Sequence, residues 1–167
     1  MRWLPILAAV LALVPAASAS SPTYRISRVI DGDTVELTNG RRVRLVQIDT
    51  PEVYNGYECY GQQASAAAKR LLPPGTRVLL QPEPASDPVD RYGRLLRYVV
   101  RASDGVNVNV RLVAVGAAAP WFYDGERGRY FAVLQTLAKR AKAKRLGLWG
   151  ACPRTIYDPY NAVTTRR

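Results

Sequence analysis

The sequence contains no histidine among its 167 residues. This absence excludes an imidazole general base, a Ser-His or Cys-His nucleophile pair, and any metal site that needs a histidine ligand. Only two cysteines occur, which is too few for a structural zinc site or an iron–sulfur cluster. Any catalysis must therefore use carboxylates, arginines, tyrosines or a hard cation bound by oxygen atoms.

Acidic residues are also scarce, with 13 Asp and Glu against 24 Lys and Arg. The formal net charge of +11 predicts a polyanionic partner, with nucleic acid as the first candidate and an anionic membrane as the second. Only 4 of the basic residues are lysine. The planar guanidinium of arginine binds phosphate in a bidentate manner, although a GC-rich genome would produce the same bias.

The N-terminal segment has the pattern of a secretory signal peptide. A short basic start precedes an uncharged apolar run, and Ala17-Ser18-Ala19 matches a small-x-small cleavage site. A membrane anchor is the alternative, but two prolines leave the compact apolar run below the ~20 residues that a spanning helix needs. We therefore expect a signal peptide at 1–19, one domain at 20–153, and a flexible tail at 154–167. The protein is then secreted, to the periplasm or the exterior, with no stable membrane association.

Export would place the two cysteines in an oxidising compartment, where two cysteines usually pair. A bridge between Cys59 and Cys152 would close a long loop, for which the chain-entropy model gives at most about 4–5 kcal/mol of stabilisation. Two free thiols are the alternative, because the sequence does not show whether the two Cα atoms come within bonding distance.

Strand patterns dominate the first two thirds of the chain. Short β-rich runs punctuated by Gly and Pro occur at 24–30, 34–37, 41–49, 77–81 and 95–101. Asn39-Gly40, between two of these runs, is a strong hairpin signal. Helical patterns occur at 62–72, 109–115 and 130–146. The predicted fold class is α+β, mainly a small five-stranded β-barrel with three helices.

Four of the acids gather in two short segments, Asp31-Gly32-Asp33 and Asp49-Thr50-Pro51-Glu52. Taken singly, the first is typical of a turn and the second of a strand end. The strand between them changes the interpretation, because its apolar alternation slips between Leu45 and Val46. A bulge there would place one set of residues on the core face (Val43, Leu45, Val46 and Ile48) and another on the opposite face (Arg42, Arg44, Gln47 and Asp49).

This arrangement would bring an arginine and several carboxylates to one side of the barrel. Two aspartates, a backbone carbonyl and waters suit a hard cation such as Ca²⁺. A further glutamate could orient or deprotonate a water, and an arginine could stabilise the charge of a phosphodiester. The segment Asp90-Arg91-Tyr92-Gly93-Arg94 is either an ordinary surface turn or a phosphate-binding segment with Arg94 directed inward.

The ordered set of motifs resembles the staphylococcal nuclease (thermonuclease) family. The matching segments are Val29–Val35, Arg44-Leu45, Asp49–Glu52, Tyr60-Gly61 with Ala64-Ser65, Asp90–Arg94, Val108-Asn109 to Leu112-Val113 with Gly116, and Gly147–Trp149. They span roughly residues 24 to 150. The resemblance implies an OB-fold, a five-stranded barrel with three helices. It also implies a Ca²⁺-dependent phosphodiesterase acting on DNA and RNA, which cuts the 5′ P–O bond and leaves 3′-phosphate ends.

The resemblance also implies roles at matching positions. Asp33 and Asp49 would be Ca²⁺ ligands together with the backbone carbonyl of Thr50. Glu52 would be the general base. Arg44 and Arg94 would bind the scissile phosphate and stabilise the transition state, and Arg94 could also protonate the leaving group.

Substrate contacts are implied for a second set of residues, namely Asp90, Arg91 and Tyr92. Arg91 stands where the family often has lysine. An aromatic side chain is expected to stack on a nucleotide base, and here the alignment leaves Phe122 or Tyr123, of which we choose Tyr123. The two cysteines are absent from the best-known member of the family. We expect the protein to be a monomer.

A non-catalytic OB-fold that binds nucleic acid is the main alternative, because such folds bind single strands through basic grooves and aromatic side chains. A basic surface adhesin is a weaker one. A pure binding protein does not need four acids beside the path of the phosphates. The acidic segments therefore favour the nuclease.

Overall fold

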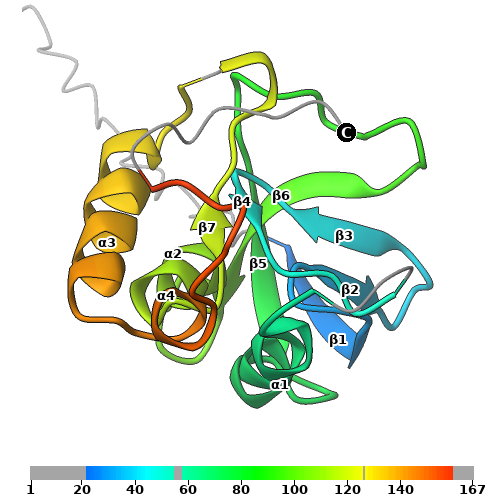
Figure 1. Ribbon diagram of the computed structural model, residues 1–167. Coiled ribbons are helices and arrows are strands. Elements are labelled where there is room, and N and C mark those ends of the chain that lie inside the picture. The colour runs from blue at the N-terminus through cyan, green and yellow to red at the C-terminus, as the bar shows by residue number, and fades with distance from the viewer. Residues whose placement is uncertain (1–21, 55–57, 126, 160–167) are drawn as a thin grey trace, which may run out of the picture.

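A closed barrel of five strands forms the centre of the computed structural model, which describes residues 22–54, 58–125 and 127–159 (Figure 1). The strands are β1 (Thr23–Val29), β2 (Thr34–Leu37), β3 (Arg42–Leu45), β5 (Arg77–Pro82) and β6 (Leu95–Arg101), in the order β1-β2-β3-β6-β5. β3 and β6 are parallel, whereas the other neighbours, including the closing pair β1 and β5, are antiparallel. The predicted five-stranded barrel is confirmed.

The three predicted helices are present as α1 (Gly61–Leu71), α2 (Val108–Ala114) and α3 (Phe131–Ala143). A one-turn helix, α4 (Leu148–Ala151), and a 3₁₀ turn, η1 (Tyr123–Gly125), are additional. Figure 1 shows α2, α3 and α4 grouped beside the barrel. α3 buries Leu134, Ala138 and Ala141 on one face, as its helical spacing predicted. The α+β fold class is therefore confirmed.

The predicted strand 41–49 is interrupted. β3 ends at Leu45, Gln47 adopts a left-handed conformation (φ 62°), and β4 (Ile48–Asp49) begins a separate two-stranded ribbon with β7 (Ala119–Pro120). The apolar residues at the slip are buried, as predicted. Gln47, however, does not share the face of Arg44 and Asp49. Its side chain is buried against Tyr98, because the left-handed turn directs it into the protein.

A disulfide joins Cys59, before α1, to Cys152, after α4, and the two Cα atoms are 5.9 Å apart. The predicted pairing is therefore present. It links segments separated by 93 residues in the sequence, so it should restrict the unfolded chain strongly.

Replacing both cysteines by serine is expected to lower the free energy of unfolding by about 2–4 kcal/mol, because the unfolded chain regains the entropy that the cross-link removes. Urea unfolding of the double variant and of the oxidised protein measures this difference. Reduction of the unsubstituted protein should shift the midpoint in the same direction. An identical midpoint for the oxidised and reduced protein would contradict the expectation.

The predicted signal peptide and the last eight residues of the predicted tail lie outside the described residues. Within the described ranges, no helix has the length and apolar character needed to cross a membrane. The first part of the expected tail, 154–159, is described, and Tyr157 packs against the core beside Glu58. The boundaries of leader, domain and tail stay predictions.

Candidate active site

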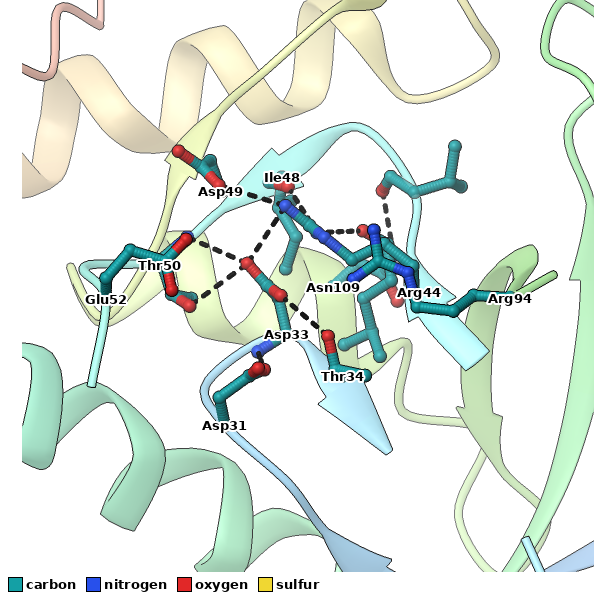
Figure 2. Close-up of polar contacts among 12 residues, drawn as sticks. Asp31, Asp33, Thr34, Arg44, Ile48, Asp49, Thr50, Glu52, Arg94 and Asn109 are labelled. Carbon is teal, nitrogen blue, oxygen red and sulfur yellow. Dashed lines mark hydrogen bonds and ion pairs between the residues drawn. The ribbon is translucent and has the colours of Figure 1, made fainter. Parts of the chain in front are cut away.

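Two aspartates converge on one arginine at the end of β3 (Figure 2). Nη2 of Arg44 lies 3.0 Å from Oδ2 of Asp33 and 2.9 Å from Oδ1 of Asp49. Nη1 of the same guanidinium donates to the carbonyls of Leu45 and Ile48, at 2.9 and 2.8 Å. The Arg44 side chain is only 14% exposed. Carboxylate oxygens from two separate segments are thus held close to a single cationic nitrogen.

The turn between β1 and β2 fixes Asp33. Oδ1 of Asp31 accepts the backbone N–H of Asp33 at 3.1 Å, an Asx turn. Thr50 donates both its backbone N–H and its hydroxyl to Oδ2 of Asp33, each at 3.0 Å. Gly32 is required for this approach, because a Cβ atom there would lie 2.4 Å from Oγ1 of Thr50. Asp33 and Thr50, which are 17 residues apart in the sequence, therefore join the two acidic segments.

Asn109 of α2 fixes the break between β3 and β4. Its Nδ2 donates to the carbonyl of Val46 at 2.8 Å, and its Oδ1 accepts the backbone N–H of Val99 at 3.0 Å. The side chain is fully buried. The left-handed turn that orients Asp49 toward Arg44 is thus tied to both α2 and β6.

The charges of this site reinforce one another. Burial alone would lower the pKa of the Arg44 guanidinium, but the surrounding carboxylates, first Asp33 and Asp49, hold that pKa above its usual value. Burial and the neighbouring charge of Asp33 raise the pKa of Asp31. Arg44 therefore stays charged at any working pH and balances the acids around it.

Glu52 lies at the edge of this cluster, next to Thr50 in Figure 2. Its charge is near enough to contribute to the raised pKa of Arg44. The backbone N–H of Glu52 donates to Oε2 of Glu58 at 3.1 Å, and the backbone N–H of Glu58 donates to the carbonyl of Glu52 at 3.1 Å. The backbone that carries the predicted base is therefore held by the segment that leads into α1.

The segment from Asp90 to Arg94 is a turn held by hydrogen bonds to the Asp90 carboxylate. Oδ1 of Asp90 accepts the backbone N–H groups of Tyr92 and Arg94, each at 2.9 Å, and Oδ2 accepts from Nε of Arg94 at 2.7 Å. Burial would raise the pKa of Asp90, but these hydrogen bonds hold it below its usual value. The ring of Tyr92 lies 4.8 Å from Cζ of Arg91 and 5.3 Å from Cζ of Arg94. Asp90 thus acts as the clamp for Arg94.

Strand pairing brings Arg94 to the cluster. Leu95, the next residue, pairs with Val43 in the parallel β3–β6 ladder, and Arg44 follows Val43. In Figure 2 the Arg94 side chain points toward Arg44. Its side chain is 28% exposed, against 14% for Arg44. Arg94 is therefore the more accessible of the two arginines.

If Arg94 binds the scissile phosphate, as the resemblance implies, Asp90→Asn is expected to lower kcat about 10-fold. The amide keeps an acceptor for the backbone but loses the charge that orients the Arg94 guanidinium. Initial rates on single-stranded DNA, together with urea unfolding, test this expectation. Arg94→Ala sets the lower limit of activity. A rate equal to that of the unsubstituted protein would show that Arg94 does not need the clamp.

The aromatic segment after β7 distinguishes Phe122 from Tyr123. Phe122 is 1% exposed, with its ring centroid 4.7 Å from that of Phe131. Tyr123 is 59% exposed. The β4–β7 ribbon, in which Asp49 pairs with Ala119, connects this segment to the acidic cluster. Only Tyr123 of the pair is open to a ligand, so the structure favours the predicted choice.

One buried polar network was not predicted. The Tyr98 hydroxyl lies 2.9 Å from Oε2 of Glu83, which also accepts the backbone N–H of Arg129 at 2.7 Å. Burial would raise the pKa of Glu83, but hydrogen bonds from the backbone N–H groups of Ala85 and Arg129 and from the Tyr98 hydroxyl hold it below its usual value. Burial and the neighbouring Glu83 raise the pKa of Tyr98. Glu83 thus fastens the chain before α3 to the barrel. A glutamate in a proline-rich loop looks like a solvated charge, so the sequence carries no signal for this role.

Among the described residues, no group of three or more His, Cys, Asp or Glu side chains has an arrangement that could hold a metal ion. The two converging carboxylates do offer hard oxygen donors. The cation found between them is the guanidinium of Arg44. The assignment of Asp33, Asp49 and the Thr50 carbonyl as metal ligands therefore stays a prediction.

Comparison with known proteins places the chain in a family. The model of the staphylococcal nuclease homologue family matches residues 42–151. An uncharacterized endonuclease of Escherichia coli O157:H7 is 38% identical over 128 residues, which cover 75% of each chain. A thermonuclease of Staphylococcus intermedius is 34% identical over 133 residues, which cover 76% of each chain. The endonuclease YncB of Bacillus subtilis is 34% identical over 131 residues, which cover 74% of this chain and 60% of YncB. The chain therefore belongs to the staphylococcal nuclease family and is a hydrolase of the nuclease class.

Proposed function

We propose that this protein is an exported, calcium-dependent nuclease that hydrolyses phosphodiester bonds in DNA and RNA and leaves 3′-phosphate ends. One observation carries the proposal. Carboxylate oxygens of Asp33 and Asp49 lie within 3.0 Å of one cationic nitrogen, beside a third acid, Glu52, and a second arginine, Arg94. Carboxylates and arginines in one place are what metal-assisted phosphodiester hydrolysis without histidine needs.

The proposed metal ligands are the carboxylates of Asp33 and Asp49 and the backbone carbonyl of Thr50. Ca²⁺ accepts such oxygen ligands in flexible geometry, with waters filling the remaining positions. Bound Ca²⁺ would supply positive charge to a phosphoryl oxygen and to the attacking water. The donor set excludes soft, thiolate-binding metals, because the only two cysteines form the disulfide.

The protein side chains have separate roles in the proposed reaction. The half-buried Glu52 carboxylate takes a proton from the attacking water. Arg94, clamped by Asp90, donates to the equatorial phosphate oxygens as they gain charge. Arg44 is already committed to two carboxylates and two carbonyls, so it acts first as the internal counter-ion and meets phosphate only after rearrangement.

Substrate binding is proposed for exposed groups around this centre. Tyr92 is 67% exposed beside Arg91, and Tyr123 is 59% exposed. Aromatic rings of this kind stack on bases without strict sequence preference, while the net charge of +11 attracts the phosphate backbone. This combination favours broad specificity for single-stranded nucleic acid.

The disulfide supports the proposed export, because such bridges persist in oxidising compartments. Export would rely on the predicted leader at 1–19. We propose that the processed protein acts as a monomer in the periplasm or outside the cell, without stable attachment to a membrane.

A chelator-controlled digestion tests the proposed activity. Purified protein is mixed with plasmid DNA, linear single-stranded DNA and RNA, with Ca²⁺ or with a chelator of Ca²⁺. Cleavage is expected with Ca²⁺, should stop with chelator and should return on adding excess Ca²⁺, since the ligands are carboxylates. The product ends are expected to lose their phosphate to a 3′-phosphatase. Cleavage that resists the chelator would contradict the metal assignment. Binding without cleavage would support the alternative, a nucleic-acid-binding protein without catalytic activity.

A further inference from the structure

The segment that follows α4 returns to the chain that carries Glu52. The hydroxyl of Tyr157 donates to Oε2 of Glu58 at 3.1 Å. The same oxygen accepts the backbone N–H of Glu52 at 3.1 Å, and the Glu58 N–H donates back to the Glu52 carbonyl at 3.1 Å. One carboxylate oxygen therefore connects the C-terminal segment to the backbone of the proposed general base.

Covalent and steric constraints hold this contact in place. Cys59, the neighbour of Glu58, is bonded to Cys152, five residues before Tyr157. Tyr157 is half-buried and packs against the core. Gly61, in the first turn of α1, also touches Glu52, because a Cβ atom there would lie 2.4 Å from the Glu52 carbonyl oxygen. The Glu52 backbone is thus enclosed by α1 on one side and tied through Glu58 to the C-terminal segment.

We propose that Glu58 is a positioning residue for Glu52, and that Tyr157, anchored by the Cys59–Cys152 disulfide, holds the Glu58 carboxylate in its working orientation. This inference rests on the proposed role of Glu52 as the base. The segment after α4 would then influence the reaction indirectly, through Glu58 and Glu52.

The physical reason lies in the sensitivity of proton transfer to distance. A base must lie within hydrogen-bond reach of its water, and a displacement of about 1 Å can cost on the order of 100-fold in rate. The two hydrogen bonds between Glu52 and Glu58 fix the backbone position from which the Glu52 side chain extends. Substrate binding relies on other residues, so the effect should fall on kcat and spare KM.

Three variants test the inference. Glu58→Ala removes the acceptor for Glu52 and Tyr157 and is expected to lower kcat roughly 10- to 100-fold with KM changed less than about 2-fold. Glu58→Gln keeps an amide oxygen that can accept both hydrogen bonds, so it is expected to recover most of the lost activity. Tyr157→Phe removes only one hydroxyl and is expected to lower kcat several-fold. Tyr24→Phe, a half-buried tyrosine of β1 outside this network, is the matched control and should leave kcat unchanged.

A second measurement reports the position of Glu52 without relying on turnover. Hydrogen exchange of the Glu52 amide, followed by NMR, should be slow in the unsubstituted protein and in Glu58→Gln, and clearly faster in Glu58→Ala. Urea unfolding shows whether each variant is folded under the assay conditions. Unchanged kcat and unchanged exchange in Glu58→Ala would overturn the inference. So would a rise in KM with kcat unaltered, because that would place Glu58 in substrate binding.

The same set of proteins separates this inference from the proposed function. If Glu52→Gln keeps full activity, Glu52 is not the base and the proposed mechanism fails, whatever Glu58 does. If Glu52→Gln is inactive while Glu58→Ala and Tyr157→Phe match the unsubstituted protein, the mechanism stands and the positioning role is refuted. Support requires that Glu58→Ala lower kcat in the presence of Glu52 and have no further effect in the Glu52→Gln background.

Discussion

Glu52→Gln should lower kcat on single-stranded DNA by about 10²- to 10⁴-fold, the usual contribution of a general base. The amide has nearly the size of the carboxylate but cannot take a proton from water. The backbone hydrogen bonds to Glu58 do not involve the substituted group, so the fold and the entry to α1 should be unaffected. Single-turnover rates at saturating Ca²⁺ measure the loss directly, without product release.

Glu58→Gln serves as the matched control for Glu52→Gln, since it makes the same chemical change at the neighbouring acid of this segment. Its activity should stay within a few-fold of the unsubstituted protein. Equal, modest effects of the two substitutions would mean that the loss comes from the general removal of negative charge. Glu52 would then have no place as a base.

Arg44→Met is expected to lower the free energy of unfolding by about 3–5 kcal/mol when Ca²⁺ is absent. The substitution leaves Asp33 and Asp49 without the cation that they share, and breaking a buried ion pair by removing one partner has this magnitude. The methionine side chain preserves part of the packing that the arginine stem provides. Urea unfolding in the presence of a chelator measures the effect.

Two comparisons identify the cause of that loss. Arg42→Met, in the same strand but with a side chain 59% exposed, should change stability by less than about 1 kcal/mol. Asp49→Asn added to Arg44→Met should recover part of the stability, because it removes one of the negative charges that Arg44 balances. Added Ca²⁺ should also stabilise Arg44→Met. A loss in Arg44→Met that neither change reduces would point to packing instead of charge.

The sequence predicted the barrel well because its signals are local. Asn39-Gly40 forms the β2–β3 turn, where the N–H of Gly40 donates to the Leu37 carbonyl at 2.9 Å. The apolar face of α3 follows from helical spacing alone. The slip between Leu45 and Val46 marked a real irregularity, but a two-residue period cannot distinguish a bulge from a left-handed turn, so the direction of Gln47 was wrong.

The candidate site was predictable in its residues and less so in its contacts. Acids in a basic chain stand out, and so Asp33 and Asp49 can be identified from the amino-acid sequence by itself. Their shared contact with Arg44 depends on the turn at Gln47 and on Asn109, which lies about 60 residues farther along the chain. Neither Glu58 nor Tyr157 belongs to a sequence motif that indicates a function. They meet where the segment after α4 lies against the segment before α1, next to the disulfide that joins the two.

The parallel pairing of β3 with β6 has a consequence for folding kinetics. β1, β2 and β3 form one meander with local contacts, and β5 and β6 form a second unit. The barrel closes when β3 pairs with β6, and the chain between these two strands includes α1. Bringing such distant segments together costs a large loop-closure entropy, so we expect this step to be slow. Asp33 and Arg44 belong to the first unit, whereas Asp90 and Arg94 lie beside or within the second. A chain in which only one of these units has formed would hold an incomplete site, so we expect activity to appear only after the barrel has closed.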